Sequence, residues 1–78
     1  MIVILHPDIE ENSQPFKETL EFLSNLPNIH LRTHVVRGDE RTLTEIYLLG
    51  DTHKIDKADI EALDTVDRVI REIGRAHV

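Results

Sequence analysis

The spacing of apolar residues changes several times along the chain, and each change predicts a new element. The first segment, residues 2–5 (IVIL), is apolar at every position, which favours a central strand covered on both faces. From residue 29 apolar or β-branched residues alternate with mostly polar ones, which predicts a strand with one face in water. One face would carry Ile29, Leu31, Thr33 and Val35, and the other His30, Arg32, His34 and Val36.

A second alternating segment lies at residues 44–49 and ends at Gly50-Asp51. One face would carry Thr44, Ile46 and Leu48, and the other Glu45, Tyr47 and Leu49. Because only a short polar stretch separates this segment from the preceding one, the two are predicted to form the arms of a hairpin.

The connection between the two arms, RGDERT at residues 37–42, has two interpretations, an active-site loop or a structural turn. Gly38 can adopt a positive φ and Asp39 suits a turn. This favours a structural turn made of Gly38, Asp39, Glu40 and Arg41. Because Arg41 follows two acidic residues, we expect its guanidinium to brace the turn rather than hold a phosphate. Replacing Arg41 with alanine should then cost about 1 kcal/mol of stability.

Two other segments have helical spacing. Ser13 is placed to cap the first helix, with Pro15 in its first turn, and Leu26-Pro27 would end it. Asp56 and Asp59 suit the start of the second helix. The inner faces would carry Phe16, Leu20 and Leu23 in the first helix, and Ile60 and Leu63 in the second.

The segment VDRVIREI at residues 66–73 fits a helical stripe or a bulged strand, and its β-branched residues favour the strand. The element order is then β-α-β-β-α-β, which predicts a ferredoxin-like α+β fold. We expect a four-stranded antiparallel sheet with both helices on one face, a domain at residues 1–74, and a tail or linker start at 75–78. The predicted core is Ile4, Phe16, Leu20, Leu23, Leu31, Ile46, Leu48, Ile60 and Leu63.

Composition excludes several classes of function. With 78 residues, 40% of them hydrophobic, the chain can build one small core. The chain has no cysteine, which rules out disulfides and thiol chemistry. A net charge of −6 argues against binding of nucleic acid. The apolar N-terminal stretch is too short for a signal peptide or a membrane span, so we expect a cytoplasmic protein without membrane contact.

Several short motifs occur in a characteristic order. They are MIVIL followed by Pro7, THVVRGDERT at 33–42, LLGD at 48–51 and IEALDTVDRVIR at 60–71. In this order and spacing the chain resembles the N-terminal ferredoxin-like domain of type I-beta 3-deoxy-D-arabino-heptulosonate 7-phosphate (DAHP) synthase. The residues that match the family pattern directly are Glu40, Arg41, Thr42, Gly50 and Asp51. Val36 stands where that pattern has serine.

The resemblance implies a role that composition does not reveal. DAHP synthase condenses phosphoenolpyruvate with erythrose 4-phosphate on a (β/α)8 barrel that uses a divalent metal. This reaction is the first step of the shikimate pathway and of aromatic amino acid biosynthesis. The appended domain resembles an ACT-like sensor, which in some members binds an aromatic amino acid between paired domains. The chain would then be a regulatory domain or a fragment of the enzyme, without a cofactor or chemistry of its own.

The residues themselves give little support to a separate enzyme. His30 and His34 would be roughly 13 Å apart on a strand, too far for one metal ion. Ser13 and Thr42 have no nearby His-Asp arrangement, and capping or turn roles explain both. The chain has only three glycines and no glycine-rich phosphate loop. Catalysis by this chain alone is therefore not expected.

Two functional hypotheses remain open. In the first, the domain senses an aromatic amino acid through Pro7, Asp8, Arg32 and His34, although Val36 offers no hydroxyl to an amino-acid head group. In the second, the domain binds no effector and pairs subunits or docks on the catalytic barrel. The contact surface proposed for this second role is the uncovered face of the sheet, with Val3, Leu5, Tyr47 and Leu49.

Overall fold

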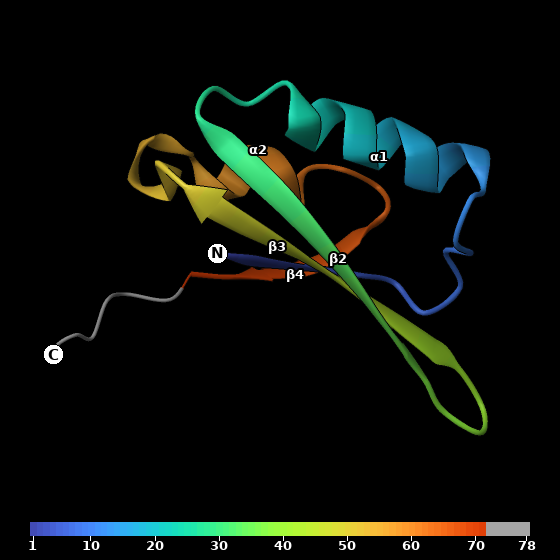
Figure 1. Ribbon diagram of the computed structural model, residues 1–78. Helices are drawn as coiled ribbons and strands as arrows, with labels where there is room; N and C mark the ends of the chain where they lie inside the picture. Colours follow the sequence, from blue (N-terminus) through green and yellow to red (C-terminus); the bar gives the residue numbers. More distant parts are fainter. Residues whose placement is uncertain (72–78) are drawn as a thin grey trace, which may run out of the picture.

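The computed structural model describes residues 1–71. It has a four-stranded antiparallel sheet in the order β2-β3-β1-β4, with both helices packed on one face (Figure 1). The predicted ferredoxin-like α+β fold is thereby confirmed. The elements are β1 (Ile2–Leu5), α1 (Gln14–Ser24), β2 (Ile29–Arg37), β3 (Thr42–Gly50), the 3-10 helix η1 (Thr52–Lys54), α2 (Lys57–Glu61) and β4 (Val66–Ile70).

Both helices begin at the residues that the sequence indicates. The Ser13 side chain accepts a hydrogen bond from the Phe16 N–H at 3.4 Å, and Pro15 lies in the first turn of α1. The Asp56 carboxylate accepts from the Ala58 N–H at 3.0 Å. Each cap provides a partner for a backbone donor that the first turn of a helix leaves unpaired.

The hydrophobic core lies between the helices and the sheet. Leu23, Ile46 and Ile60 are fully buried in it, and Leu20, Leu31 and Leu63 pack against it while partly buried. The buried members of this core are Met1, Val3, Leu5, Phe16, Leu23, Ile46, Leu48, Ile60, Val66 and Val69.

The orientation predicted for β1 is wrong by one residue. Val3 and Leu5, which we had placed on the uncovered face, are 0% exposed and belong to the helix-facing core. Val3 lies opposite the core residue Ile46. Ile4, predicted in the core, is buried but lies on the other face, opposite Glu45 and Arg68. Because every residue of IVIL is apolar, the segment has no alternation from which its inner face could be read.

The connection between β2 and β3 is a tight turn at residues 38–41. The Gly38 N–H donates to the Arg41 carbonyl at 2.9 Å. Gly38 does not adopt the positive φ that is open to glycine, and among glycines of residues 1–71 only Gly50 has one, at 122°. Within the same residues the Arg41 guanidinium has no ion pair or hydrogen bond with Glu40 or Asp39, so the expected brace is not formed.

The last third of the chain contains one unpredicted element and one confirmed strand. The unpredicted element is η1, between β3 and α2. Residues 66–70 form β4, as the β-branched run indicated, and its pairing with β1 is irregular between Ile4 and Leu5. The Arg71 guanidinium donates to the carbonyls of Thr52, at 3.1 Å, and Ile55. The domain boundary at residue 74 and the tail at 75–78 lie outside the described residues.

Candidate functional site

The four residues predicted to bind an effector lie in two separate hollows. Arg32 and His34 line a hollow of about 330 Å³ on the uncovered face of the sheet. Pro7 and Asp8 line another, of about 570 Å³, between the β1–α1 loop and the end of the β2–β3 hairpin. The structure therefore does not assemble the four into one site. We refer to the first as the sheet hollow and to the second as the loop hollow.

The sheet hollow combines a cation with apolar and aromatic surface. Its lining residues are Arg32, Thr33, His34, Tyr47 and Leu49. Arg32 lies directly opposite Tyr47 in the β2–β3 register. Within residues 1–71 its guanidinium makes no ion pair and no hydrogen bond with another side chain. Arginine side chains form bidentate hydrogen bonds with carboxylates.

Glu45 joins two of the other side chains at this hollow. The Tyr47 hydroxyl donates to Glu45 Oε1 at 3.1 Å, and His34 Nδ1 lies 3.5 Å from the same oxygen. Glu45 is also the cross-strand partner of His34. The side chain that orients both polar groups was not among our candidates, although its position opposite His34 follows from the hairpin register.

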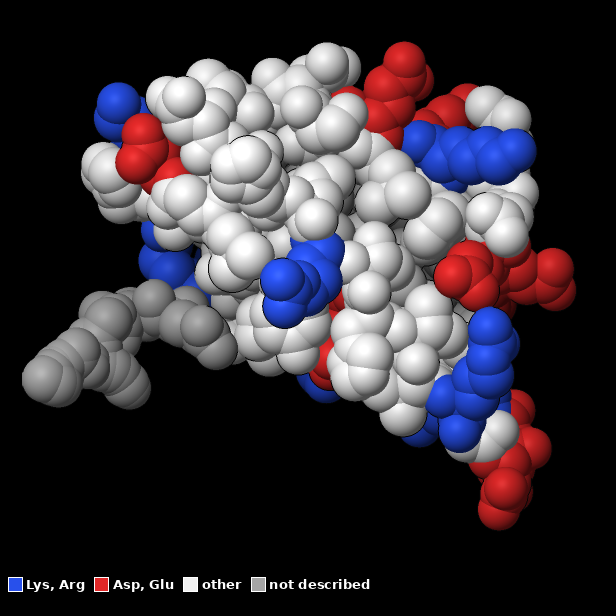
Figure 2. Space-filling view, in the orientation of Figure 1, with Lys and Arg blue, Asp and Glu red and all other residues white. Residues whose placement is uncertain are grey.

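Apolar side chains extend the uncovered face beyond the hollow. Ile2 lies between Tyr47 of β3 and Ile70 of β4. Leu49 is 46% exposed and Ile70 is 43% exposed. Val36, near the hairpin end of β2, is also 43% exposed. We call Ile2, Val36, Tyr47, Leu49 and Ile70 the open-face strip. Figure 2, in the orientation of Figure 1 with the helices uppermost, shows uncharged surface interrupted near its middle by a basic side chain, and further charged side chains toward the edges and the hairpin tip.

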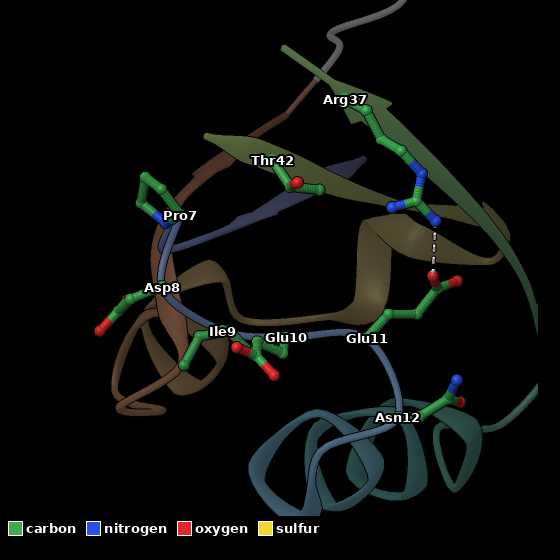
Figure 3. A pocket seen from close by; sticks show the side chains of 8 residues that line it. All are labelled: Pro7, Asp8, Ile9, Glu10, Glu11, Asn12, Arg37 and Thr42. Carbon is green, nitrogen blue, oxygen red and sulfur yellow. Dashed lines mark hydrogen bonds and ion pairs between the residues drawn. The ribbon is translucent and has the colours of Figure 1, made fainter. Parts of the chain in front are cut away.

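The loop hollow has a different chemical character (Figure 3). Among the described residues that line it, Arg37 alone is basic, and its Nη2 donates to Glu11 Oε1 at 3.2 Å. Asp8 and Glu10 add two further carboxylates. This ion pair connects the end of β2 to the β1–α1 loop, and the excess of carboxylates disfavours an anionic ligand.

Comparison with protein families provides the decisive observation. The family model described as the DAHP synthase ferredoxin-like domain matches residues 1–71, which is the whole of the described structure. The chain belongs to this family. A comparison with curated proteins found no match.

Membership in the DAHP synthase ferredoxin-like domain family agrees with the positions of the motifs that suggested it. Gly50 ends β3 with a positive φ, and Asp51 follows the strand directly. Glu40 and Arg41 lie in the turn before β3, and Thr42 begins that strand. The matching residues thus occupy the two ends of one strand, and none of them lines the sheet hollow.

The described part of this DAHP synthase domain lacks two features, a metal-binding cluster and a membrane-spanning helix. Residues 1–71 contain no cluster of three or more His, Cys, Asp or Glu side chains that could hold a metal ion. Among the same residues, no helix is long and apolar enough to cross a membrane.

Proposed function

We propose that this domain is a non-catalytic regulatory module of a DAHP synthase, and that its open-face strip docks on the catalytic barrel of that enzyme. The observation that carries the proposal is the exposure of Leu49 and Ile70, 46% and 43%, on a sheet face that neither helix of residues 1–71 covers. Burying apolar surface contributes about 25 cal/mol per Å². Covering this strip with a partner surface therefore stabilises the complex of the two.

Charge on this face restricts the partner. Arg32 and Arg68 lie on the same face as the strip, and the acidic residue between them in the sheet, Glu45, already contacts His34 and Tyr47. The excess positive charge suits an apolar surface with acidic residues at its rim. Such complementarity sets the orientation of docking more than its strength.

The docking proposal is tested by binding of the 78-residue chain to a separately produced DAHP synthase barrel. Leu49→Lys places a charge in the middle of the strip and should raise the dissociation constant at least about tenfold. Phe22→Lys is the matched control, because Phe22 is 40% exposed but lies on α1, on the helical side. Equal affinity for both variants and the unchanged chain would contradict docking through the strip.

The sheet hollow supports a second candidate function, sensing of an aromatic amino acid. Arg32 would hold the carboxylate, and the ring would pack against Leu49 and Tyr47. His34 would lie within the same hollow as a polar partner, with Glu45 beside it. In this proposal Pro7 and Asp8 play no direct part, because they line the separate loop hollow.

Sensing is tested by thermal unfolding with and without tyrosine or phenylalanine. A ligand that binds only the folded state stabilises it by about 2.7 kcal/mol at a concentration one hundred times its dissociation constant. Arg32→Ala should abolish the rise in midpoint, whereas Arg68→Ala, which removes a cation of the same face outside the hollow, should retain it. A midpoint that neither amino acid changes would leave docking as the function of this face.

A further inference from the structure

A pocket of about 230 Å³ lies among the helical elements, apart from the sheet hollow and the loop hollow. The end of α1 and the α1–β2 loop form one wall, and η1 and the start of α2 form the other. We call it the helical pocket. None of its described lining residues lines either hollow or belongs to the open-face strip. It is therefore distinct from the sites considered for docking and sensing.

Apolar side chains form much of the lining of the helical pocket. Ile60 is fully buried, and Leu26 and Ile55 pack against the core while partly buried. Phe22 is 40% exposed and adds an aromatic ring. Pockets for drug-sized ligands usually have volumes of about 300–1,000 Å³. A smaller pocket with this lining suits a ligand whose apolar part is one ring or one branched chain.

Hydrogen bonds hold the two walls of the pocket in place. The Asp51 N–H donates to the Asn28 carbonyl at 3.3 Å, which joins one wall to the other. The Arg71 guanidinium donates to the carbonyls of Thr52 and Ile55, and so secures the start and the C-cap of η1. Because the walls are fixed without a ligand, binding would cost little ordering of the chain.

Carboxylates outnumber ammonium groups around the helical pocket. Asp51, Asp56 and Asp59 line it together with one described cation, Lys54, so three negative charges and one positive charge give a formal net charge of −2. The Asp56 carboxylate also accepts from the Ala58 N–H at 3.0 Å. Asp51 is half-buried, which reduces the screening of its charge by salt. Such a site attracts cations and repels anions.

We propose that the helical pocket binds a small organic cation, in which a short chain joins an ammonium group to an aromatic or branched apolar body. The body packs against Phe22, Leu26 and Ile60, and the ammonium group lies near the carboxylates that line the pocket. The face of the Phe22 ring also attracts a cation. An aromatic amino acid is a poorer ligand here, because its carboxylate adds a negative charge where negative charge is already in excess.

This binding is independent of the proposed docking and sensing, which use the other face of the sheet. Leu49→Lys should weaken docking and leave the binding of a cation in the helical pocket unchanged. Phe22→Lys should leave docking unchanged but abolish cation binding, because it places a positive charge at the pocket. Each proposal can therefore fail without the others.

Titration of the 78-residue chain with 2-phenylethylamine, followed by NMR of the backbone amides, tests the proposal. At ligand concentrations up to about 10 mM, we expect saturable shifts at the pocket residues Phe22, Leu26, Ile55 and Ile60. 2-Phenylethanol has the same body without the charge, and both it and phenylalanine should bind the pocket at least about threefold more weakly. The absence of saturable shifts at these amides with the amine would overturn the proposal, as would equal affinity for the amine and either of the other two compounds.

Substitutions distinguish the pocket from general attraction to an acidic chain. Asp59→Asn should raise the dissociation constant for 2-phenylethylamine about threefold, as befits the loss of one partly solvated ion pair, and Phe22→Ala should raise it at least as much. Glu21→Gln is the matched control, because it removes one carboxylate from α1 outside the pocket and should have no effect. All three residues are exposed, so the variants should fold, which circular dichroism checks. Equal affinities in the three variants and the unchanged chain would overturn the assignment of the site.

Discussion

Position 50 requires glycine, because of its backbone conformation and the backbone atoms next to it. Its φ is 122°, which side-chain-bearing residues rarely adopt. A Cβ atom at this position would collide with the Asn28 carbonyl oxygen and lie 3.5 Å from the Ile29 Cα. The adjacent Asp51 N–H donates to that same carbonyl. The close approach of β3 to the start of β2 therefore depends on glycine.

Gly50→Ala should lower the free energy of unfolding by about 2 kcal/mol, because the new side chain meets rigid backbone in a strained conformation. Urea denaturation measures this loss. Gly38→Ala is the control, since its φ is not positive and its Cβ would lie 3.1 Å from the Arg41 carbonyl oxygen. We expect it to cost less than half as much. Equal losses would show that the positive φ is not the cause.

Thr19 and Thr65 form a buried polar contact that the sequence did not reveal. They are 4% and 8% exposed, and their hydroxyls are hydrogen-bonded to each other. Thr19 donates its only hydroxyl proton to the Pro15 carbonyl at 2.9 Å, so Thr65 must be the donor between the two. The contact joins α1 to the residue before β4.

Thr19→Val should cost about 1–3 kcal/mol, because Thr65 is left as a buried donor without its acceptor. The double variant Thr19→Val, Thr65→Val replaces both groups with apolar ones of the same shape and should be more stable than Thr19→Val alone. Thermal unfolding of the two single variants and the double variant gives the coupling between the sites. Strictly additive losses would mean that the hydroxyls do not depend on each other.

At the scale of elements, the hairpin turn is closed by backbone groups. The bond from the Gly38 N–H to the Arg41 carbonyl survives any change of the Arg41 side chain, and that side chain is exposed. The earlier expectation of a loss of about 1 kcal/mol assumed a guanidinium brace, which the structure does not contain.

Arg41→Ala should therefore change the free energy of unfolding by no more than about 0.5 kcal/mol, as is usual for surface substitutions. Arg37→Ala offers a comparison, since it removes the ion pair with Glu11. Both side chains of that pair are partly exposed, so solvent screening should limit this loss to less than about 1 kcal/mol. Chemical denaturation of both variants decides the matter. A clear loss of stability in Arg41→Ala, without one in Arg37→Ala, would support a guanidinium brace after all.

The elements differ in how far the sequence could specify them. Helix caps at Ser13 and Asp56 and the alternation in β2 and β3 were correctly predicted, because each depends on neighbouring residues. The inner face of β1 depends on its pairing with β3 and could not be read from a uniformly apolar segment. The separation of Arg32 and His34 from Pro7 and Asp8 also depends on tertiary structure. The sheet order determines whether these residues lie close together or far apart, and the local sequence does not reveal that order.

At the scale of the whole molecule, the sheet has one dry and one accessible face, and neighbouring residues of β1 belong to different faces. Val3 is 0% exposed beneath the helices, whereas Ile2 is only partly buried on the open-face strip. A charge introduced at position 3 should therefore destabilise the folded state far more than a charge at position 2.

Val3→Lys should cost more than about 4 kcal/mol, enough to unfold a domain of this size, because it places an unpaired charge in the core. Ile2→Lys should keep the fold, since the lysine can extend its charged end into solvent. Circular dichroism and thermal unfolding distinguish the two. If Ile2→Lys unfolds and Val3→Lys does not, β1 has the opposite orientation.

The position of Tyr47 makes the open face visible to optical spectroscopy. The chain has one tyrosine and no tryptophan, and that tyrosine lies on β3 with its hydroxyl bonded to Glu45. Ultraviolet emission from the chain therefore originates almost entirely from a single fluorophore beside the sheet hollow. A molecule that covers this face changes the environment of Tyr47 and therefore the emission of the chain. The unlabelled chain can thus report, in a simple titration, whether anything settles on the side of the sheet that the helices leave uncovered.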